Sequence, residues 1–302
     1  MPSITRVLLS DARVLAAYVI FAGSYLVFAL GKFPWMKIDR PGAAIIGAVL
    51  MVAFGIVGGG EALASVDFAT VVLLFAMMLI VGSLRLAGFF AWITDWMIER
   101  LHPQLAAPEL QHGRLRKKPV LVLVVVLAGL LAGVPRAMTA AVGAALLLIT
   151  RTVEPRRLYD EIDWGLLVFF VGLFIIVGGA DRAGLTARLL EPVNAWNLHR
   201  IPIFVGSTAV LSNIVSNVPG VMLLRTVVSA FPDPRLGWIA LAMASTLAGR
   251  LTITGSVANI IVVERAAAEG VHVGSREYLR VGAPLTVATV VVGSLWLWAT
   301  SP

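Results

Sequence analysis

The sequence predicts an all-α, polytopic membrane protein with about eight transmembrane helices, one re-entrant hairpin and an inverted internal repeat whose first copy is incomplete. Of the 302 residues, 59% are hydrophobic and 14% are charged, whereas soluble domains carry roughly 25% charged residues. Runs without charge recur along the chain, and most approach the ~17–25 residues that cross a hydrocarbon core as a helix. The chain also contains an internal repeat and a polar interruption within an apolar segment.

The apolar runs define eight spans. They lie at about residues 14–31, 41–58, 67–86, 119–135, 137–151, 163–180, 236–268 and 280–299. Basic residues gather in alternate connections, around Lys37, Arg116 and Arg156, and the positive-inside rule assigns those connections to the cytoplasm. Both termini are then predicted to lie outside. The first apolar run is too long for a cleaved signal peptide, so we expect it to remain in the chain.

Three further segments do not have the pattern of straight spans. Residues 87–101 and 183–198 mix apolar, tryptophan and charged side chains, which is typical of interfacial helices. Residues 201–231 are apolar but contain Pro219-Gly220 near their middle. Because a Pro-Gly pair is unfavourable inside a helix, this segment is predicted to form a re-entrant hairpin.

An internal repeat relates two parts of the chain. A shift of 96 residues aligns residues 40–88 with residues 136–184 without a gap, and 13 of the 49 pairs are identical. The identical pairs include Gly47 with Gly143 and Asp67 with Asp163. The charge pattern places Asp67 outside and Asp163 inside, so the two copies are predicted to have inverted topologies. Inverted repeats are typical of secondary transporters.

The repeat predicts three parts of the chain. Residues 1–103 form an incomplete first copy with three spans and an interfacial helix, residues 104–117 form a basic cytoplasmic linker, and residues 118–302 form a complete second copy. A hairpin and two spans of the second copy have no counterpart in the first. Their absence removes an even number of crossings, so the remaining topology is unaffected.

Composition excludes several classes of function. The chain has no cysteine, and its four histidines lie in connecting segments without metal-ligand spacing. No nucleophile–base pair, phosphate-binding glycine loop or nucleotide fingerprint is present, so we expect neither a metal site nor catalytic residues nor enzyme activity. The net charge of +7 is explained by membrane topology, and nucleic acid is not an expected partner.

Two polar runs within apolar segments form the candidate binding site. At the hairpin tip and at a break in the seventh span, backbone groups lose their helical partners, and the bilayer offers no water to replace them. Ser and Asn side chains can satisfy those groups and also bind an ion. Alternatively, they only cap the broken helices. The candidate residues are Ser212, Asn213, Ser216, Asn217, Val218, Arg250, Thr254, Gly255, Ser256 and Asn259.

Charged residues near the spans suggest different roles. Arg250 lies inside the interrupted span, with 14 uncharged residues before it and 13 after it. Binding of an anion, displacement of a sodium ion and extension to the interface are open roles for it. Asp67 and Asp163 each begin a span, where a carboxylate caps exposed amides. No carboxylate lies in the middle of a span, so Na+ is a better candidate than H+ as coupling ion, and no other cofactor is expected.

Three runs resemble motifs of the ion transporter superfamily: residues 162–164 (IDW), 212–219 (SNIVSNVP) and 255–259 (GSVAN). The arsenite permease and citrate transporter-like branch, related to the divalent anion:sodium symporters, is the most similar. The resemblance covers essentially the whole chain except for the gap in the first copy. It implies that the hairpin tip and the break form one site, and that the protein is a homodimer. The family usually has Asn at the position of Arg250.

These features together predict a secondary active transporter of a small anion or oxyanion, such as a carboxylate, an inorganic anion or arsenite, in the cytoplasmic membrane. The expected partners are the solute, the lipid bilayer and a second copy of the chain. An alternative follows from the incomplete first copy. The chain would then be a non-transporting remnant or deletion form of such a transporter, or a subunit that needs a partner chain.

Overall fold

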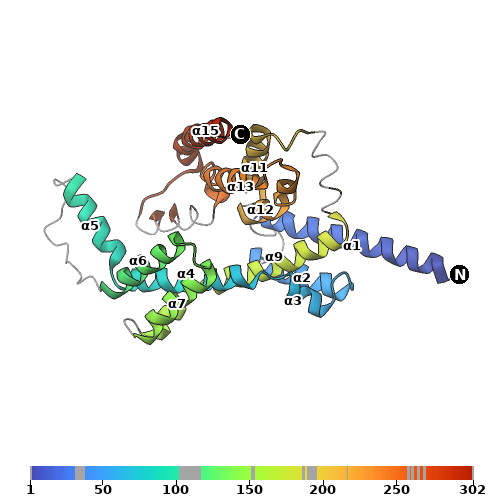
Figure 1. Ribbon diagram of the computed structural model, residues 1–302, viewed down its shortest axis with the longest axis horizontal. Coiled ribbons are helices and arrows are strands. Elements are labelled where there is room, and N and C mark those ends of the chain that lie inside the picture. Colours follow the sequence, from blue (N-terminus) through green and yellow to red (C-terminus); the bar gives the residue numbers. More distant parts are fainter. Residues whose placement is uncertain are drawn as a thin grey trace. The chain divides into compact units, whose positions relative to one another are not determined.

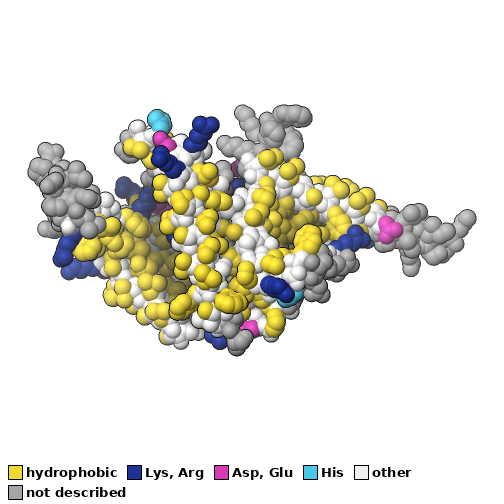
Figure 2. Space-filling model, turned by 90° about the horizontal axis from the view of Figure 1, so that it is seen from above, with side chains coloured by type: hydrophobic (Ala, Val, Ile, Leu, Met, Phe, Trp, Pro, Cys, Tyr) yellow, Lys and Arg dark blue, Asp and Glu magenta, His cyan; other side chains and the backbone are white. Residues whose placement is uncertain are grey.

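The computed structural model describes residues 2–30, 38–101, 117–150, 154–185, 188, 196–215, 217–256, 259, 262–263, 266–267 and 270–300 (Figure 1). Every regular element in these residues is a helix, which confirms the predicted all-α class. Within the described part of the chain, four helices contain stretches long and apolar enough to cross a membrane. They are α1 (Pro2–Leu30, from Asp11 onward), α4 (Phe68–Leu86), α9 (Trp164–Arg182) and α15 (Ser275–Thr300). Hydrophobic side chains cover much of the face in Figure 2, as expected of a surface that contacts lipid.

The other predicted spans are shorter helices. They are α2 (Arg40–Ala53), α6 (Lys117–Leu131), α7 (Arg136–Ile149) and α13 (Pro234–Ala248). Fifteen helical residues rise only ~22 Å, less than the ~30 Å hydrocarbon core. The predicted span ends at residues 58 and 135 are therefore wrong. Positive φ angles at Gly55 (64°) and Gly133 (79°) stop helical geometry before those residues, so the number of full crossings stays a prediction.

The internal repeat is present in the helices themselves. α2 begins at Arg40 and ends at Ala53, and α7 begins and ends 96 residues later, at Arg136 and Ile149. The same offset relates α4 to α9 at both ends, and α3 (Gly59–Ser65) corresponds to α8 (Pro155–Asp160). Both long helices are followed by a glycine with positive φ, 78° at Gly88 and 84° at Gly184. The inverted orientation of the copies stays a prediction.

The chain divides into two compact units, and each unit combines helices from both copies. One unit contains residues 1–65 and 172–302, and the other contains residues 66–171. In the first, a methyl group at Gly47 of α2 would lie 2.6 Å from Ile176 Cδ1 of α9. In the second, a methyl group at Gly143 of α7 would lie 3.5 Å from Ile80 Cδ1 of α4. These residues are equivalent by the 96-residue shift, so each copy's short helix packs on the other copy's long helix.

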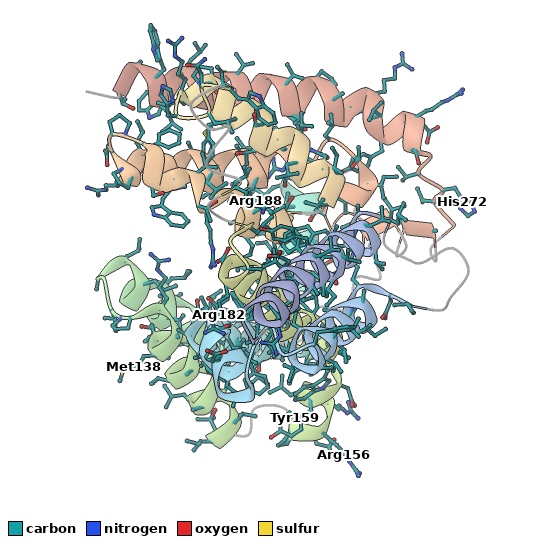
Figure 3. The ribbon with its side chains drawn as sticks, turned by 90° about the vertical axis from the view of Figure 1, so that its right-hand side faces the viewer. Met138, Arg156, Tyr159, Arg182, Arg188 and His272 are labelled. Carbon is teal, nitrogen blue, oxygen red and sulfur yellow. The ribbon has the colours of Figure 1, made fainter. Side chains whose placement is uncertain are left out.

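The unit of residues 66–171 is built on α4. Helices α6, α7 and α8 pack on α4, and Figure 1 shows α7 crossing it. Ala76, Leu79 and Ile80 of α4 are buried in this core. Arg85 at the end of α4 forms an ion pair of 2.8 Å with Glu161 after α8. Figure 3 shows Met138 and Arg156 on the outside of this unit.

The unit of residues 1–65 and 172–302 contains a second core. It lies among α11 (Ile201–Val215), α13 and α15, and its most buried members include Phe204 and Leu241. Elsewhere, Gly88 separates α4 from α5 (Phe89–Leu101), so the predicted segment of residues 87–101 does form a helix of its own. Residues 102–116, with most of the predicted linker, and much of the segment of residues 183–198 lie outside the described residues.

Candidate functional site

The predicted hairpin consists of α11 and α12 (Asn217–Leu224), and its re-entrant course in the membrane stays a prediction. α11 ends at Val215, and α12 folds back so closely that a methyl group at Gly220 would lie 3.3 Å from Ser212 Cα. Pro219 stands in the first turn of α12, where its missing N–H removes no helical hydrogen bond. The predicted turn is present, but it precedes the Pro-Gly pair, which lies inside α12 and does not interrupt it. Ser216 lies outside the described residues.

The predicted break in the seventh span begins directly after α13. Gly249 caps α13, Thr252 and Ser256 are extended, and Ile253–Gly255 form a single 3-10 turn, η2. Two glycines are required here. A methyl group at Gly249 would lie 2.8 Å from the Asn217 amide, and one at Gly255 would lie 2.7 Å from Asn213 Oδ1. The hairpin and the break are thus in direct contact, as the sequence predicts.

Two asparagines donate hydrogen bonds to backbone carbonyls at the break. Asn213 Nδ2 donates to Ala248 O at 2.8 Å and also to Ala209 O in its own helix at 2.9 Å. Asn259 Nδ2 donates to Gly249 O at 2.7 Å and to Thr252 O at 3.1 Å. Each amide group therefore satisfies two acceptors, which stabilises the end of α13 in its broken conformation.

Asn217 and Ser212 complete the network. The acceptors around Asn217 fix its amide orientation, with Nδ2 at 3.1 Å from Gly255 O, 3.2 Å from Ser245 O and 2.6 Å from Ser212 Oγ. Ser212 Oγ accepts from this nitrogen and donates to Ser245 O at 3.3 Å. Ser212 is fully buried and Ser245 is 4% exposed. The side chains from the hairpin thus hold the break from one side.

Capping therefore accounts for the amide nitrogens of the three asparagines. An ion or solute would instead be bound by the amide oxygens of these asparagines, the backbone at the break and the neighbouring residues. This binding role stays a prediction. Val218 and Ser256 are half-buried beside the network. Thr254 contributes its backbone to η2. Arg250 is exposed, and no ion pair among the described residues involves it.

Two contacts that were not predicted from the sequence anchor the hairpin. The buried Tyr25 hydroxyl of α1 donates to Pro219 O at 3.2 Å, and Arg225 after α12 forms an ion pair of 3.0 Å with Asp181 of α9. A tyrosine within an apolar run was a signal for the first contact. The second had no signal, because residues 44 positions apart become neighbours only through the fold.

Two buried hydroxyls near the site have no hydrogen-bond partner among the described residues. They belong to Thr208, one turn before Ser212 on α11, and Thr286 of α15. The two residues are 1% and 5% exposed. α15 approaches the break closely, since a methyl group at Gly282, one turn before Thr286, would lie 2.7 Å from Arg250 O. Spacing from Ser212 was a signal for Thr208, whereas nothing in the sequence indicates Thr286.

The aspartates before the long helices act as caps, as predicted. Asp67 Oδ1 accepts from Thr70 N at 3.2 Å, and Asp163 Oδ1 accepts from Leu166 N at 2.9 Å. The Thr70 hydroxyl also donates to Asp67 Oδ2 at 2.5 Å. This bond stabilises the ionised carboxylate and lowers the pKa of Asp67 below its usual value.

Comparison with known families identifies the scaffold. The sequence model of the citrate transporter family matches residues 25–106 and 106–248. The chain belongs to this family. The two matched segments meet at residue 106, in the connection where the sequence predicts a missing hairpin and two spans. The match includes the hairpin and ends at the last residue of α13, so the break itself lies beyond it.

Individual relatives support membership of the citrate transporter family. A Dictyostelium discoideum protein that carries the name transporter arsB is 36% identical over 181 residues, which are 57% of this chain and 32% of that protein. The rice silicon efflux transporter LSI3 is 34% identical over 145 residues, 44% of this chain and 30% of LSI3. An uncharacterized Mycobacterium tuberculosis transporter is 26% identical over 256 residues, 78% of this chain and 60% of that protein. The chain thus spans from about a third to three fifths of these relatives.

Proposed function

We propose that the chain is a secondary active transporter of a small anion or oxyanion in the cytoplasmic membrane. The observation that carries the proposal is the meeting of two broken apolar segments, the turn between α11 and α12 and the break after α13, in one polar network. Broken helices at membrane depth are tolerated where they line a binding cavity, and transporters use them to bind substrates and ions. Membership of the citrate transporter family and the names of the relatives support the same proposal.

The ends of the broken helices suggest how charge is recognised. α11 and α13 direct their carbonyl ends to the network, which favours a cation, whereas α12 directs its amide end there, which favours an anion. We propose Na+ as the coupling ion, bound by backbone carbonyls and Ser, Thr or Asn oxygens. The anionic solute would bind near the first turn of α12. Arg250, which directly follows the Gly249 cap at the start of the break, would add positive charge there.

The proposal is tested by uptake into proteoliposomes. The purified protein is supplied with labelled citrate, succinate, sulfate, phosphate, arsenite or silicate under an imposed Na+ or H+ gradient. Silicate is included because one relative is named as a silicon transporter. Asn217→Ala removes the amide at the centre of the network, and Ser229→Ala, an exposed position in the same unit, is the matched control.

We expect gradient-dependent uptake of one class of solute, retained in Ser229→Ala and lost in Asn217→Ala. Reconstitution at different protein densities, with the oligomeric state measured in parallel, tests the proposed homodimer. Folded protein that accumulates no solute at any density would contradict the transport proposal. Activity that appears only after addition of a second, different chain would instead favour the subunit alternative.

A further inference from the structure

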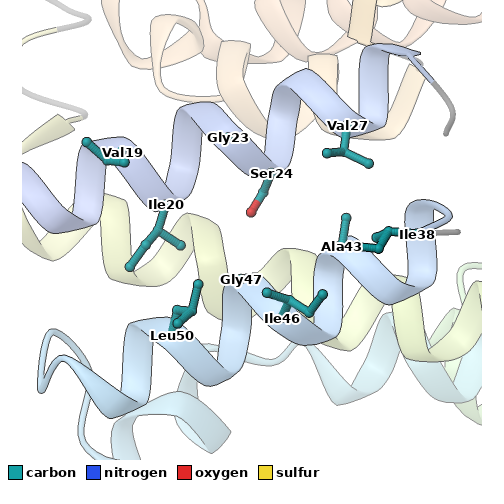
Figure 4. Close-up of a pocket in the computed structure, with 10 residues that line it drawn as sticks. All are labelled: Val19, Ile20, Gly23, Ser24, Val27, Ile38, Ala43, Ile46, Gly47 and Leu50. Atoms are coloured by element: carbon teal, nitrogen blue, oxygen red, sulfur yellow. The ribbon is translucent and has the colours of Figure 1, made fainter. Parts of the chain in front are cut away.

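A groove between α1 and α2 lies apart from the broken-helix site. Its volume is about 260 Å3, and every residue that lines it is apolar or glycine except Ser24 (Figure 4). It runs from Val19 and Leu50 at one end to Val27 and Ile38 at the other. Gly47 lies at the floor of this groove, against Ser24 and the Ile176 side chain.

The groove is open toward the surface of the membrane-spanning region. Val19 on α1 is 62% exposed and Ile46 on α2 is 45% exposed, and both line the groove. A methyl group at Gly23 would meet no heavy atom within 4 Å, so the space beside α1 is unfilled there. An open apolar groove that runs along a transmembrane helix has the chemistry and direction of a lipid acyl chain.

One end of the groove carries Arg40, beside Asp39, whose carboxylate caps α2 by accepting from Gly42 N at 2.9 Å. Arg40 lies between the lining residues Ile38 and Ala43, and its Nε donates to Phe28 O at 3.1 Å, beside Val27. No acceptor among the described residues takes the two terminal nitrogens of the guanidinium. Arg40 is half-buried, and it forms no ion pair with a carboxylate of the described residues. A planar guanidinium suits a phosphate, which it can bind through two parallel hydrogen bonds.

We propose that this groove binds one anionic phospholipid, with an acyl chain along α1 and α2 and the phosphate on Arg40. The sequence places Lys32 and Lys37 in the same connection, and the positive-inside rule assigns that connection to the cytoplasmic side. Anionic lipids attract basic residues at that surface. The site is independent of the proposed transport activity, because none of its residues belongs to the network of the hairpin and the break.

The test measures lipid retained by the full chain. The protein is delipidated and incubated in mixed micelles with equal amounts of phosphatidylglycerol and phosphatidylcholine that carry the same acyl chains. Native mass spectrometry then counts the lipids bound to each protein. For the wild type we expect one retained lipid, with phosphatidylglycerol preferred about fivefold.

Three variants and a control test the apolar groove and the headgroup contact at Arg40 separately. Gly23→Leu fills the groove and is expected to lose the retained lipid, whereas Gly206→Leu, at an exposed α11 glycine that also has no neighbour within 4 Å, is expected to keep it. Arg40→Gln is expected to abolish the preference for phosphatidylglycerol. Arg40→Lys is expected to keep part of it, because the charge remains but the two parallel hydrogen bonds are lost.

Equal retention of the two lipids by the wild type would overturn the proposal. Unchanged lipid retention in Gly23→Leu would also overturn it. If this variant retains lipid but shifts from dimer to monomer, the groove is occupied by a second copy of the chain instead. If Gly23→Leu does not fold, the comparison of wild type, Arg40→Gln and Arg40→Lys decides, since a headgroup preference that is independent of residue 40 contradicts the proposal.

Discussion

The duplicated helices and the broken helices of this protein are stabilised in different ways. The duplicated part occurs twice, as α2 on α9 and as α7 on α4, and it is held by apolar side chains packed against glycines. The broken part, from α11 to η2, occurs once among the described residues and is held by side-chain amides on backbone carbonyls. Steric fit therefore determines the geometry of the first region, and hydrogen-bond satisfaction determines that of the second.

This difference explains how the two regions tolerate sequence change. The duplicated helices keep their lengths and offsets although only 13 of 49 aligned residues are identical. Apolar packing accepts many side chains of suitable volume. A buried carbonyl, in contrast, needs a donor at one position and in one orientation. We therefore expect the largest effects of single substitutions in the broken region.

The largest loss of stability is expected for Asn213→Asp. The substitution keeps the shape of the side chain but replaces the donor that faces Ala248 O at 2.8 Å and Ala209 O at 2.9 Å with an acceptor. Repulsion from these carbonyls and loss of both bonds should lower the free energy of unfolding by about 3 kcal/mol. Thermal unfolding in detergent measures the effect, with Ser229→Ala as the exposed control. A melting temperature equal to that of the wild type would show that the network does not stabilise the break.

Within the duplicated helices, the largest effect is expected for Gly172→Ala. The new methyl group would lie 2.6 Å from Ala44 O and 2.8 Å from Ala44 Cβ, so α9 would have to move away from α2. We expect a loss of roughly 1–3 kcal/mol, the usual cost of overpacking. The equivalent residue of the first copy is Ala76, which is already buried in its core, so the two copies differ in this contact.

Gly206→Ala is the control for this substitution, because a methyl group there has no neighbour within 4 Å. Thermal unfolding of both variants, measured together, separates steric conflict from the gain in helix propensity that any Gly→Ala change brings. Equal melting temperatures for the two variants would show that α2 and α9 can separate without cost.

Thr286→Val should act in the opposite direction. The Thr286 hydroxyl is buried without a partner among the described residues, and valine has nearly the same shape. Removal of an unsatisfied hydroxyl should raise the stability of the ligand-free protein by about 1 kcal/mol. If this hydroxyl also contacts the solute, the same variant should weaken uptake in proteoliposomes. A lower melting temperature would show that the hydroxyl has a partner in the folded protein, such as a buried water.

Some features of the fold were predictable from the sequence and others were not. Charge-free runs indicated the helices, and the repeat indicated their equivalence, because both depend on local composition. The exchange of helices between the two copies was not predictable. The sequence shows that Gly47 corresponds to Gly143 and Ile80 to Ile176, but only the fold shows that Gly47 meets Ile176. Helix ends were missed where a glycine adopts positive φ, since a glycine in an apolar run gives no indication of its conformation.

The contact between the hairpin and the break was predictable because broken helices in a membrane need specific side chains, whereas binding at this contact stays a prediction. Asn213, Asn217 and Asn259 stood out as amides in apolar surroundings, and they do meet at the break. The residues that the sequence did not indicate act through backbone or through distant partners. Ser245 contributes a carbonyl, and Asp181 depends on Arg225. Such contacts have no signature in residue type, because any residue supplies a carbonyl and many charges lie near helix ends.

Effects of similarly small size are expected at the two aspartate caps, which allow the two copies to be compared directly. Asp67 accepts from the Thr70 backbone and hydroxyl, whereas Asp163 accepts from the Leu166 backbone at 2.9 Å and has leucine at the position of the threonine. Replacement of either aspartate by alanine should cost roughly 1 kcal/mol. The Thr70 hydroxyl lowers the pKa of Asp67, which precedes the span of α4.

The direction of this pKa shift fixes the pH dependence at Asp67. Since the folded pKa lies below the unfolded value of about 3.9, the ionised carboxylate stabilises the fold above that value. The contribution is lost as the pH falls through the folded pKa, and solvent exposure keeps it small. Melting curves from pH 6 to pH 3 should therefore converge for wild type and Asp67→Asn, which keeps an acceptor for the cap but does not titrate. A separation that stays constant down to pH 3 would show that the Thr70 hydroxyl does not select the ionised form.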